Sequence, residues 1–136
     1  MADLTIKPAD VAPVRVVQQF TGPADEAIDA GEMVRLNTST GQFTLANASS
    51  AAEGRVIGMS MTTTTLAGQT ITVVSKGLVD VGDAVTALDY DLALELSDTD
   101  GKIDDGDGTP TGTYVIGRVF PGWGATTADK LILLDL

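Results

Sequence analysis

The chain has 136 residues, a length typical of one domain, and it contains neither cysteine nor histidine. Disulfides and thiolate metal sites are therefore excluded, and the commonest general base of enzymes is missing. With 19 acids against 8 bases the net charge is −11, which disfavours binding to nucleic acids and to anionic membranes. We expect a protein without catalytic chemistry or cofactor that binds other protein surfaces.

Two further features narrow where the protein works and what fills its interior. No apolar run approaches the roughly 20 residues of a membrane helix. The stretch Met1–Pro8 lacks a basic start followed by an apolar run, so we expect no signal peptide. The protein is then made and kept in a cytoplasm, or exported only as part of an assembly. Because aromatic residues make up only 4% of the chain, the core must consist of aliphatic side chains.

Runs that alternate apolar and polar residues predict many short strands separated by turns. In chain order the strands are expected at 14–20, 33–36, 42–45, 55–63, 70–75, 78–81, 84–88, 92–96, 113–120 and 130–136. The turn-forming residues Asn37–Gly41 join the second and third of these into a hairpin. No segment carries an apolar helical period over several turns. The predicted fold class is all-β, a compact sandwich or barrel that forms a single domain over residues 14–136.

Short motifs occur twice and indicate a two-unit pseudo-repeat. Gly31–Leu36 resembles Gly82–Leu88, and Gly54–Gly58 resembles Gly112–Gly117. We therefore expect two similar β-units, at about 31–77 and 82–136, that share one core. The alternative is that such motifs recur by chance in β-proteins.

The two ends of the chain are candidates for contacts with other molecules. Residues 1–13 contain two prolines and no clear pattern, so they predict an N-terminal arm, either loose or ordered on a neighbour by strand addition. The last strand, 130–136, is apolar on both faces, which predicts either a central position in the sheet or cover by another subunit. Candidate interface residues at these ends are Leu4, Ile6, Pro8, Leu134 and Leu136.

An acidic stretch is the most conspicuous chemical feature, with ten acids and one base between residues 80 and 109. Asp98, Asp100 and Gly101 follow the spacing of a calcium loop, in which oxygen ligands surround the ion. Leu96, however, stands where the first aspartate of such a loop belongs. A solvated loop is the favoured interpretation, and a weak cation site at Asp98, Asp100 and Asp104 is the alternative.

The aromatic segment Phe120–Gly124 places Trp123 between two glycines on a turn or loop. Tryptophan is enriched among interface anchors. Phe120 and Trp123 are therefore candidate contacts for a partner or a second copy. The alternative is that the indole folds back over one end of the β-domain.

Several of these motifs together resemble one known family. They are Ile57-Gly58, the run Ala67–Gly77, Gly82-Asp83-Ala-Val85 and Val115-Ile116-Gly117. Over residues 31–136 the chain resembles the capsid decoration, or cement, proteins of tailed phages, in particular a small family first described as a domain of unknown function. The acidic insert near 98–108 and the leading residues 1–30 depart from that pattern.

The resemblance implies a structural virion protein that binds the outside of an expanded phage capsid and clamps neighbouring capsomers. It implies the major capsid protein as partner and a homo-oligomer, with a trimer as first expectation and a dimer as alternative. It implies no catalytic residues. Two other functions stay open: another phage structural role in a tail or fibre, and a carbohydrate- or cation-binding β-sandwich module.

Overall fold

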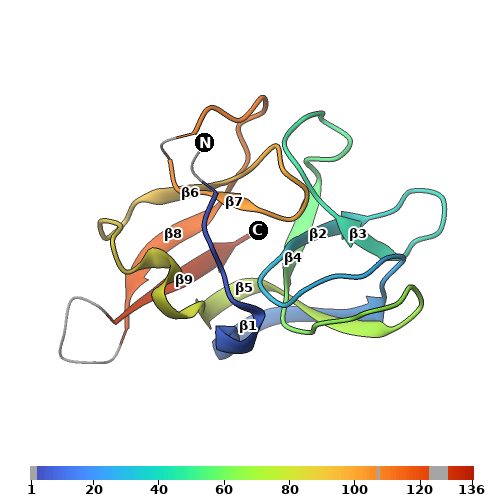
Figure 1. Cartoon of the computed structure of the whole chain (residues 1–136), viewed down its shortest axis with the longest axis horizontal. Helices are drawn as coiled ribbons and strands as arrows, with labels where there is room; N and C mark the ends of the chain where they lie inside the picture. The colour runs from blue at the N-terminus through green and yellow to red at the C-terminus, as the bar shows by residue number, and fades with distance from the viewer. Residues whose placement is uncertain (1–2, 107, 123–128) are drawn as a thin grey trace.

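The computed structural model describes residues 3–106, 108–122 and 129–136 (Figure 1). Nine strands and two short 3-10 helices are found in this part of the chain. In chain order they are η1 (Pro8–Asp10), β1 (Ala12–Pro23), β2 (Met33–Leu36), β3 (Phe43–Leu45), β4 (Val56–Ser60), β5 (Thr70–Asp80), η2 (Gly82–Val85), β6 (Ala93–Leu96), β7 (Ile103–Asp104), β8 (Val115–Pro121) and β9 (Lys130–Asp135). The predicted all-β class is confirmed.

The strands form one curled sheet in which every pair is antiparallel. Its order is β3-β2-β4-β5-β9-β8-β6-β7, and β1 pairs with β5 outside this path. The long strand β5 therefore has three neighbours, β1, β4 and β9. In Figure 1 it lies at the centre of the lower part of the molecule, with β1 beneath it. Strand β5 therefore joins three parts of the sheet: β1, the group β3-β2-β4 and the group β9-β8-β6-β7.

The pairing pattern repeats about β5, which ends one unit and begins the next. In unit one (β1–β5) the order is β1-β5-β4-β2-β3, and in unit two (β5–β9) it is β5-β9-β8-β6-β7. The hairpin register repeats as well, because Leu36 faces Phe43 and Leu96 faces Ile103. Two units with shared pairing and register support the predicted pseudo-repeat, with β5 belonging to both.

One of the two predicted motif matches is wrong. The structure places Gly82–Val85 in the 3-10 helix η2, so this segment is not the counterpart of strand β2. The counterpart of β2 is β6, since both pair with a hairpin partner and with the strand that carries Val-Ile-Gly. The strand expected at 84–88 is absent for the same reason.

The second predicted match, between the two Val-Ile-Gly motifs, is confirmed by geometry. Val34 faces Gly58 and Leu94 faces Gly117, and each pair is followed by a shift in register. A side chain on either glycine would clash with a backbone carbonyl, that of Val74 next to Gly58 and that of Leu133 next to Gly117. Only glycine allows the neighbouring strand to approach so closely. The motif thus recurs because each unit needs the same close strand contact.

Aliphatic side chains fill the interior in two clusters. The larger lies between the units and the smaller belongs to unit one alone. Strand β2 serves both, because Met33 packs into the larger cluster while Val34 points into the smaller. A strand between two clusters is buried on both faces, which locks the position of unit one against unit two.

Candidate protein-binding surfaces

The acidic turn of unit two is a structural turn and repeats one in unit one. In the uncharged turn Asn37–Gly41, the Asn37 side chain accepts the N–H of Ser39 at 2.9 Å, and Gly41 has φ +71°. In the acidic turn, the Ser97 hydroxyl accepts the N–H of Thr99 at 3.1 Å, and Gly101 has φ +74°. Because the same conformation forms without acids, hairpin geometry accounts for the spacing that resembles a calcium loop.

The three candidate carboxylates for a cation bind different parts of the chain. Asp98 accepts the N–H of Thr111 at 2.9 Å. Asp100 accepts the Asn47 amide at 2.6 Å, and buried Asp104 accepts two N–H groups of the loop that follows it. Within the described ranges, no three acidic side chains gather in an arrangement suited to a metal ion. Asp98 and Asp100 therefore tie loops to one another, and Asp104 ties the loop that follows it to strand β7.

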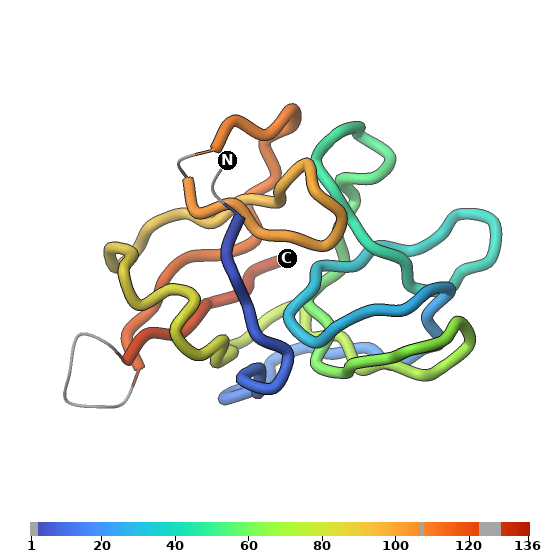
Figure 2. Tube along the Cα trace, in the orientation of Figure 1, coloured from blue at the N-terminus to red at the C-terminus, as the bar shows by residue number. Residues whose placement is uncertain are grey.

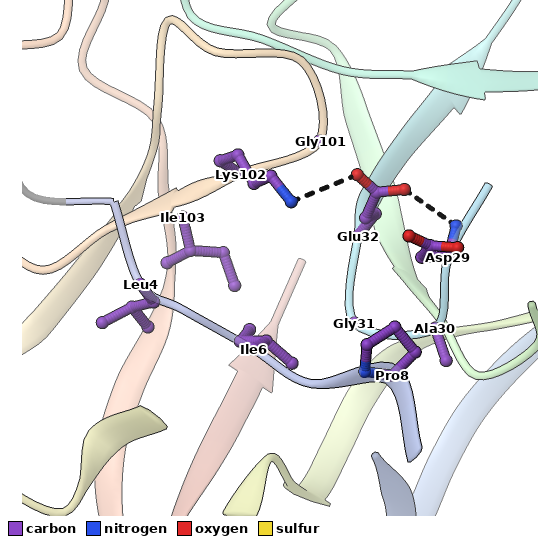
Figure 3. Close-up of a pocket in the computed structure, with 10 residues that line it drawn as sticks. All are labelled: Leu4, Ile6, Pro8, Asp29, Ala30, Gly31, Glu32, Gly101, Lys102 and Ile103. Carbon is purple, nitrogen blue, oxygen red and sulfur yellow. Dashed lines mark hydrogen bonds and ion pairs between the residues drawn. The ribbon is translucent and has the colours of Figure 1, made fainter. Parts of the chain in front are cut away.

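The expected N-terminal arm is packed against its own domain over the residues that the structure describes. Leu4 is only 8% exposed and its N–H donates to the carbonyl of Ile103 at 2.8 Å. Ile6 is half-buried against the core and lies beside Gly31, where an added side chain would approach it to 2.7 Å. Figure 3 shows this segment crossing from unit two to unit one, over a gap of about 20 Å³.

Two of the predicted interface residues are therefore unavailable to a partner. Leu4 is buried for the reason just given, and Leu134 is buried because β9 lies between β5 and β8. The central position predicted as one alternative for the last strand is confirmed. Leu136 packs partly against the core, whereas Pro8 is exposed at the start of η1.

The aromatic candidates divide between described and undescribed parts of the chain. Phe120, near the end of β8, is 37% exposed. Trp123 lies outside the described residues, so its predicted roles stay predictions. Tyr90, which sequence reasoning did not single out, is also exposed, on the turn between η2 and β6. Lys130 lies over its ring, with the Nζ atom 4.7 Å from the ring centroid.

Strand β1 is the longest in the sheet and contributes almost nothing to the core. Ten of its twelve residues are exposed, including the adjacent pair Val16 and Val17. In the described chain it pairs only with β5, along its whole length. Three register shifts and a proline at each end distort it, which is how edge strands are protected from adding another strand. Contacts at β1 are therefore expected through side chains.

A groove follows the outer end of unit one. Two adjoining hollows of about 370 and 360 Å³ share Leu36, Gly41 and Ile57. One extends to Phe20 on β1 and the other to Arg55, the only charged residue among those that line either hollow. We call the two together the unit-one groove. The groove could not be predicted from the sequence. An apolar residue at the end of a strand, such as Leu36 in β2, occurs in buried strands as well as at exposed grooves.

Among the described titratable groups, Asp135 has a pKa that its surroundings clearly lower. The Lys76 ammonium donates to the Asp135 carboxylate at 2.8 Å and lowers the pKa of that carboxyl through this hydrogen bond and its charge. Both side chains are exposed. This is an ion pair between β5 and β9 on the surface of the sheet.

No family model, curated protein or solved structure matches this chain. Among the described residues, no helix has the length and apolar character needed to cross a membrane. Function must therefore be argued from the surfaces themselves.

Proposed function

We propose that this protein is a structural virion component that binds the outer surface of an expanded phage capsid and holds neighbouring capsomers together. The observation that supports this proposal is strand β1, a twelve-residue strand with ten exposed residues. A strand of a self-sufficient antiparallel sheet usually buries one face. A long strand with neither face buried and an exposed valine pair offers a ready surface to a large partner. The partner proposed for it is the major capsid protein.

The way β1 is held suits a clamp. Pairing with β5 along its full length fixes its backbone before any partner arrives. Binding then loses little backbone entropy, so more of the contact energy remains as affinity. Many copies on one shell add their contacts multivalently. An acidic exterior keeps such particles apart in solution.

The proposal also agrees with the side-chain chemistry of the described chain. The acids with the most suggestive spacing are engaged in tethering loops. Histidine and cysteine are missing from the sequence. A clamp needs neither, because its work is done by shape, rigidity and copy number.

The test is binding to shells of a phage that encodes this chain. Purified protein should bind expanded, undecorated shells and raise their melting temperature, and it should bind unexpanded shells poorly. Val17→Asp should weaken binding at least tenfold by introducing a carboxylate into the apolar contact. Leu66→Asp is a matched control, since Leu66 and Val17 are both 68% exposed but Leu66 belongs to the loop between β4 and β5 and not to β1. Absence of binding to expanded shells would refute the function, and equal binding by both variants would refute the role of β1.

A further inference from the structure

The unit-one groove has the composition of a docking site. Its floor is formed by the buried ring of Phe43 and the partly buried Ile57, and Phe20 and Leu36 stand exposed at its margin. Gly41, at its far side, has open space where a side chain would be. Arg55 is exposed and forms no ion pair with any described residue. An apolar groove with one unpaired cation fits an apolar side chain that has a carboxylate beside it.

Unit two carries a surface with that chemistry, which we call the Tyr90 corner. It consists of exposed Tyr90 between two exposed acids, Asp89 and Asp91, together with Phe120. The N–H of Asp91 donates to the carbonyl of Val119 at 2.8 Å, so this turn is fastened to the end of β8 next to Phe120.

The charged groups around the Tyr90 ring leave one of its two neighbouring acids without an ion pair to any described residue. Lys130 stacks over the ring and donates to the carbonyl of Leu88, which holds the ring in place. Asp91 forms an exposed ion pair with Arg118 at 2.9 Å. Asp89 forms no ion pair with any described residue. An exposed aromatic ring held rigid beside an unpaired carboxylate complements a groove that has an unpaired arginine.

The distribution of charge along the chain supports the same pairing. Residues 81–136 contain eleven acids and three bases, whereas residues 1–80 contain eight acids and five bases, so unit two is the more acidic of the two units. Two copies that carry −11 each repel one another in most orientations. An approach that sets unit two of one copy against Arg55 and the less acidic unit one of another meets less repulsion than a contact between two copies of unit two.

The two surfaces lie at opposite ends of the molecule. Along the horizontal axis of Figures 1 and 2, the β2–β3 turn is at one end and the segment between η2 and β6 is at the other. They cannot meet within one chain. We propose that the unit-one groove receives the Tyr90 corner of a second copy, so that the protein associates head to tail. Such a heterologous contact closes into a ring or continues as a chain, depending on the rotation between copies. This inference stands apart from capsid binding.

Sedimentation velocity of the purified full chain tests the contact. The average mass should exceed that of the monomer and rise with protein concentration, and association should weaken as salt screens the Arg55–Asp89 pair. R55E and D89K should each reduce the association constant at least tenfold, because each places like charges together. Both side chains are exposed, so thermal unfolding should be unchanged.

Charge exchange gives the decisive comparison. Combining both substitutions in one chain restores opposite charges at every contact and should restore association. Mixing R55E with D89K restores opposite charges wherever the two variants alternate, so the mixture should associate more strongly than either variant alone. For the apolar part, Leu36→Gln should reduce association. Val115→Gln is its control, since Leu36 is 45% and Val115 50% exposed and Val115 belongs to neither surface. A protein that stays monomeric, or variants that associate like the parent chain, would overturn the proposal. Association that R55E and D89K abolish but that neither their mixture nor the double variant recovers would also overturn it.

Discussion

Replacing Leu4 by alanine measures how firmly the N-terminal segment is held to its own domain. The substitution removes three carbon atoms from a side chain that packs in the larger core cluster with 8% exposure. At about 0.8 kcal/mol per buried methylene, the loss of burial is about 2.4 kcal/mol. The site lies at the margin of the core, where solvent and neighbours fill the space, so the additional cavity effect is small. We expect L4A to lower the free energy of unfolding by about 2.5 kcal/mol.

Urea denaturation followed by circular dichroism gives this number as a shift in midpoint with an unchanged slope. Leu66→Ala is the control, because Leu66 is 68% exposed and its truncation should change stability by less than about 0.5 kcal/mol. Equal stabilities of L4A and L66A would refute the packed segment. Residues 3–10 would then be a free arm, available to a neighbouring molecule.

Three further outcomes follow from the same contacts. Gly58→Ala and Gly117→Ala should each lower the free energy of unfolding by about 1–3 kcal/mol in the same urea denaturation, because the new side chain meets a backbone carbonyl. Unchanged stability of both variants would contradict the close strand contact that the two units share. Lys76→Met should raise the pKa of Asp135 toward its ordinary value in an NMR titration, and an unchanged pKa would contradict the pairing. Because folding lowers this pKa, the ion pair stabilises the fold at pH values above the pKa of Asp135 in the unfolded chain. That stabilisation is lost as the pH falls through the pKa of Asp135 in the folded protein. Calcium should leave the melting temperature unchanged, since Asp98 and Asp100 accept hydrogen bonds from Thr111 and Asn47; a clear rise would revive the cation site.

Most strands could be predicted because the alternation of apolar and polar residues reflects a sheet with one face inside. Errors arose where glycine changed the geometry. The sequence predicts two strands at 70–75 and 78–81, but the chain runs through Gly77 as one strand, β5. Gly77 has φ +141° and lies against the carbonyl of Arg15, so it accommodates an irregular stretch of the β1–β5 pairing. A glycine that ends a strand and one that bends it look alike in a sequence.

The N-terminal segment could not be placed from sequence because its contacts are too few to form a pattern. Among its described residues, only Leu4 and Ile6 pack in or against the larger core cluster, two apolar side chains between prolines and charges. Such spacing is compatible both with a free arm and with a segment packed on its own domain. Only the folded structure shows that Leu4 lies at Ile103 and Ile6 lies at Gly31.

The acids of the turn after β6 formed a pattern, but that pattern did not indicate a cation site. Asp98 and Asp100 are regularly spaced because the hairpin turn is regular, and the turn does not depend on their charge.

The exposure of equivalent residues in the two units explains why the unit-one groove could not be predicted from the sequence. Leu36 and Leu96 occupy the same register in their hairpins, yet the first is 45% and the second 0% exposed. The unit-two hairpin packs on unit one, where Gly101 donates its N–H to the carbonyl of Ala46. Within the described residues, no further unit packs on the unit-one hairpin, and Gly41 at its tip faces open space. This face is uncovered in the same way as a face of the terminal unit in a repeat array. The leucine at the same hairpin position is therefore core in unit two and lines the groove in unit one.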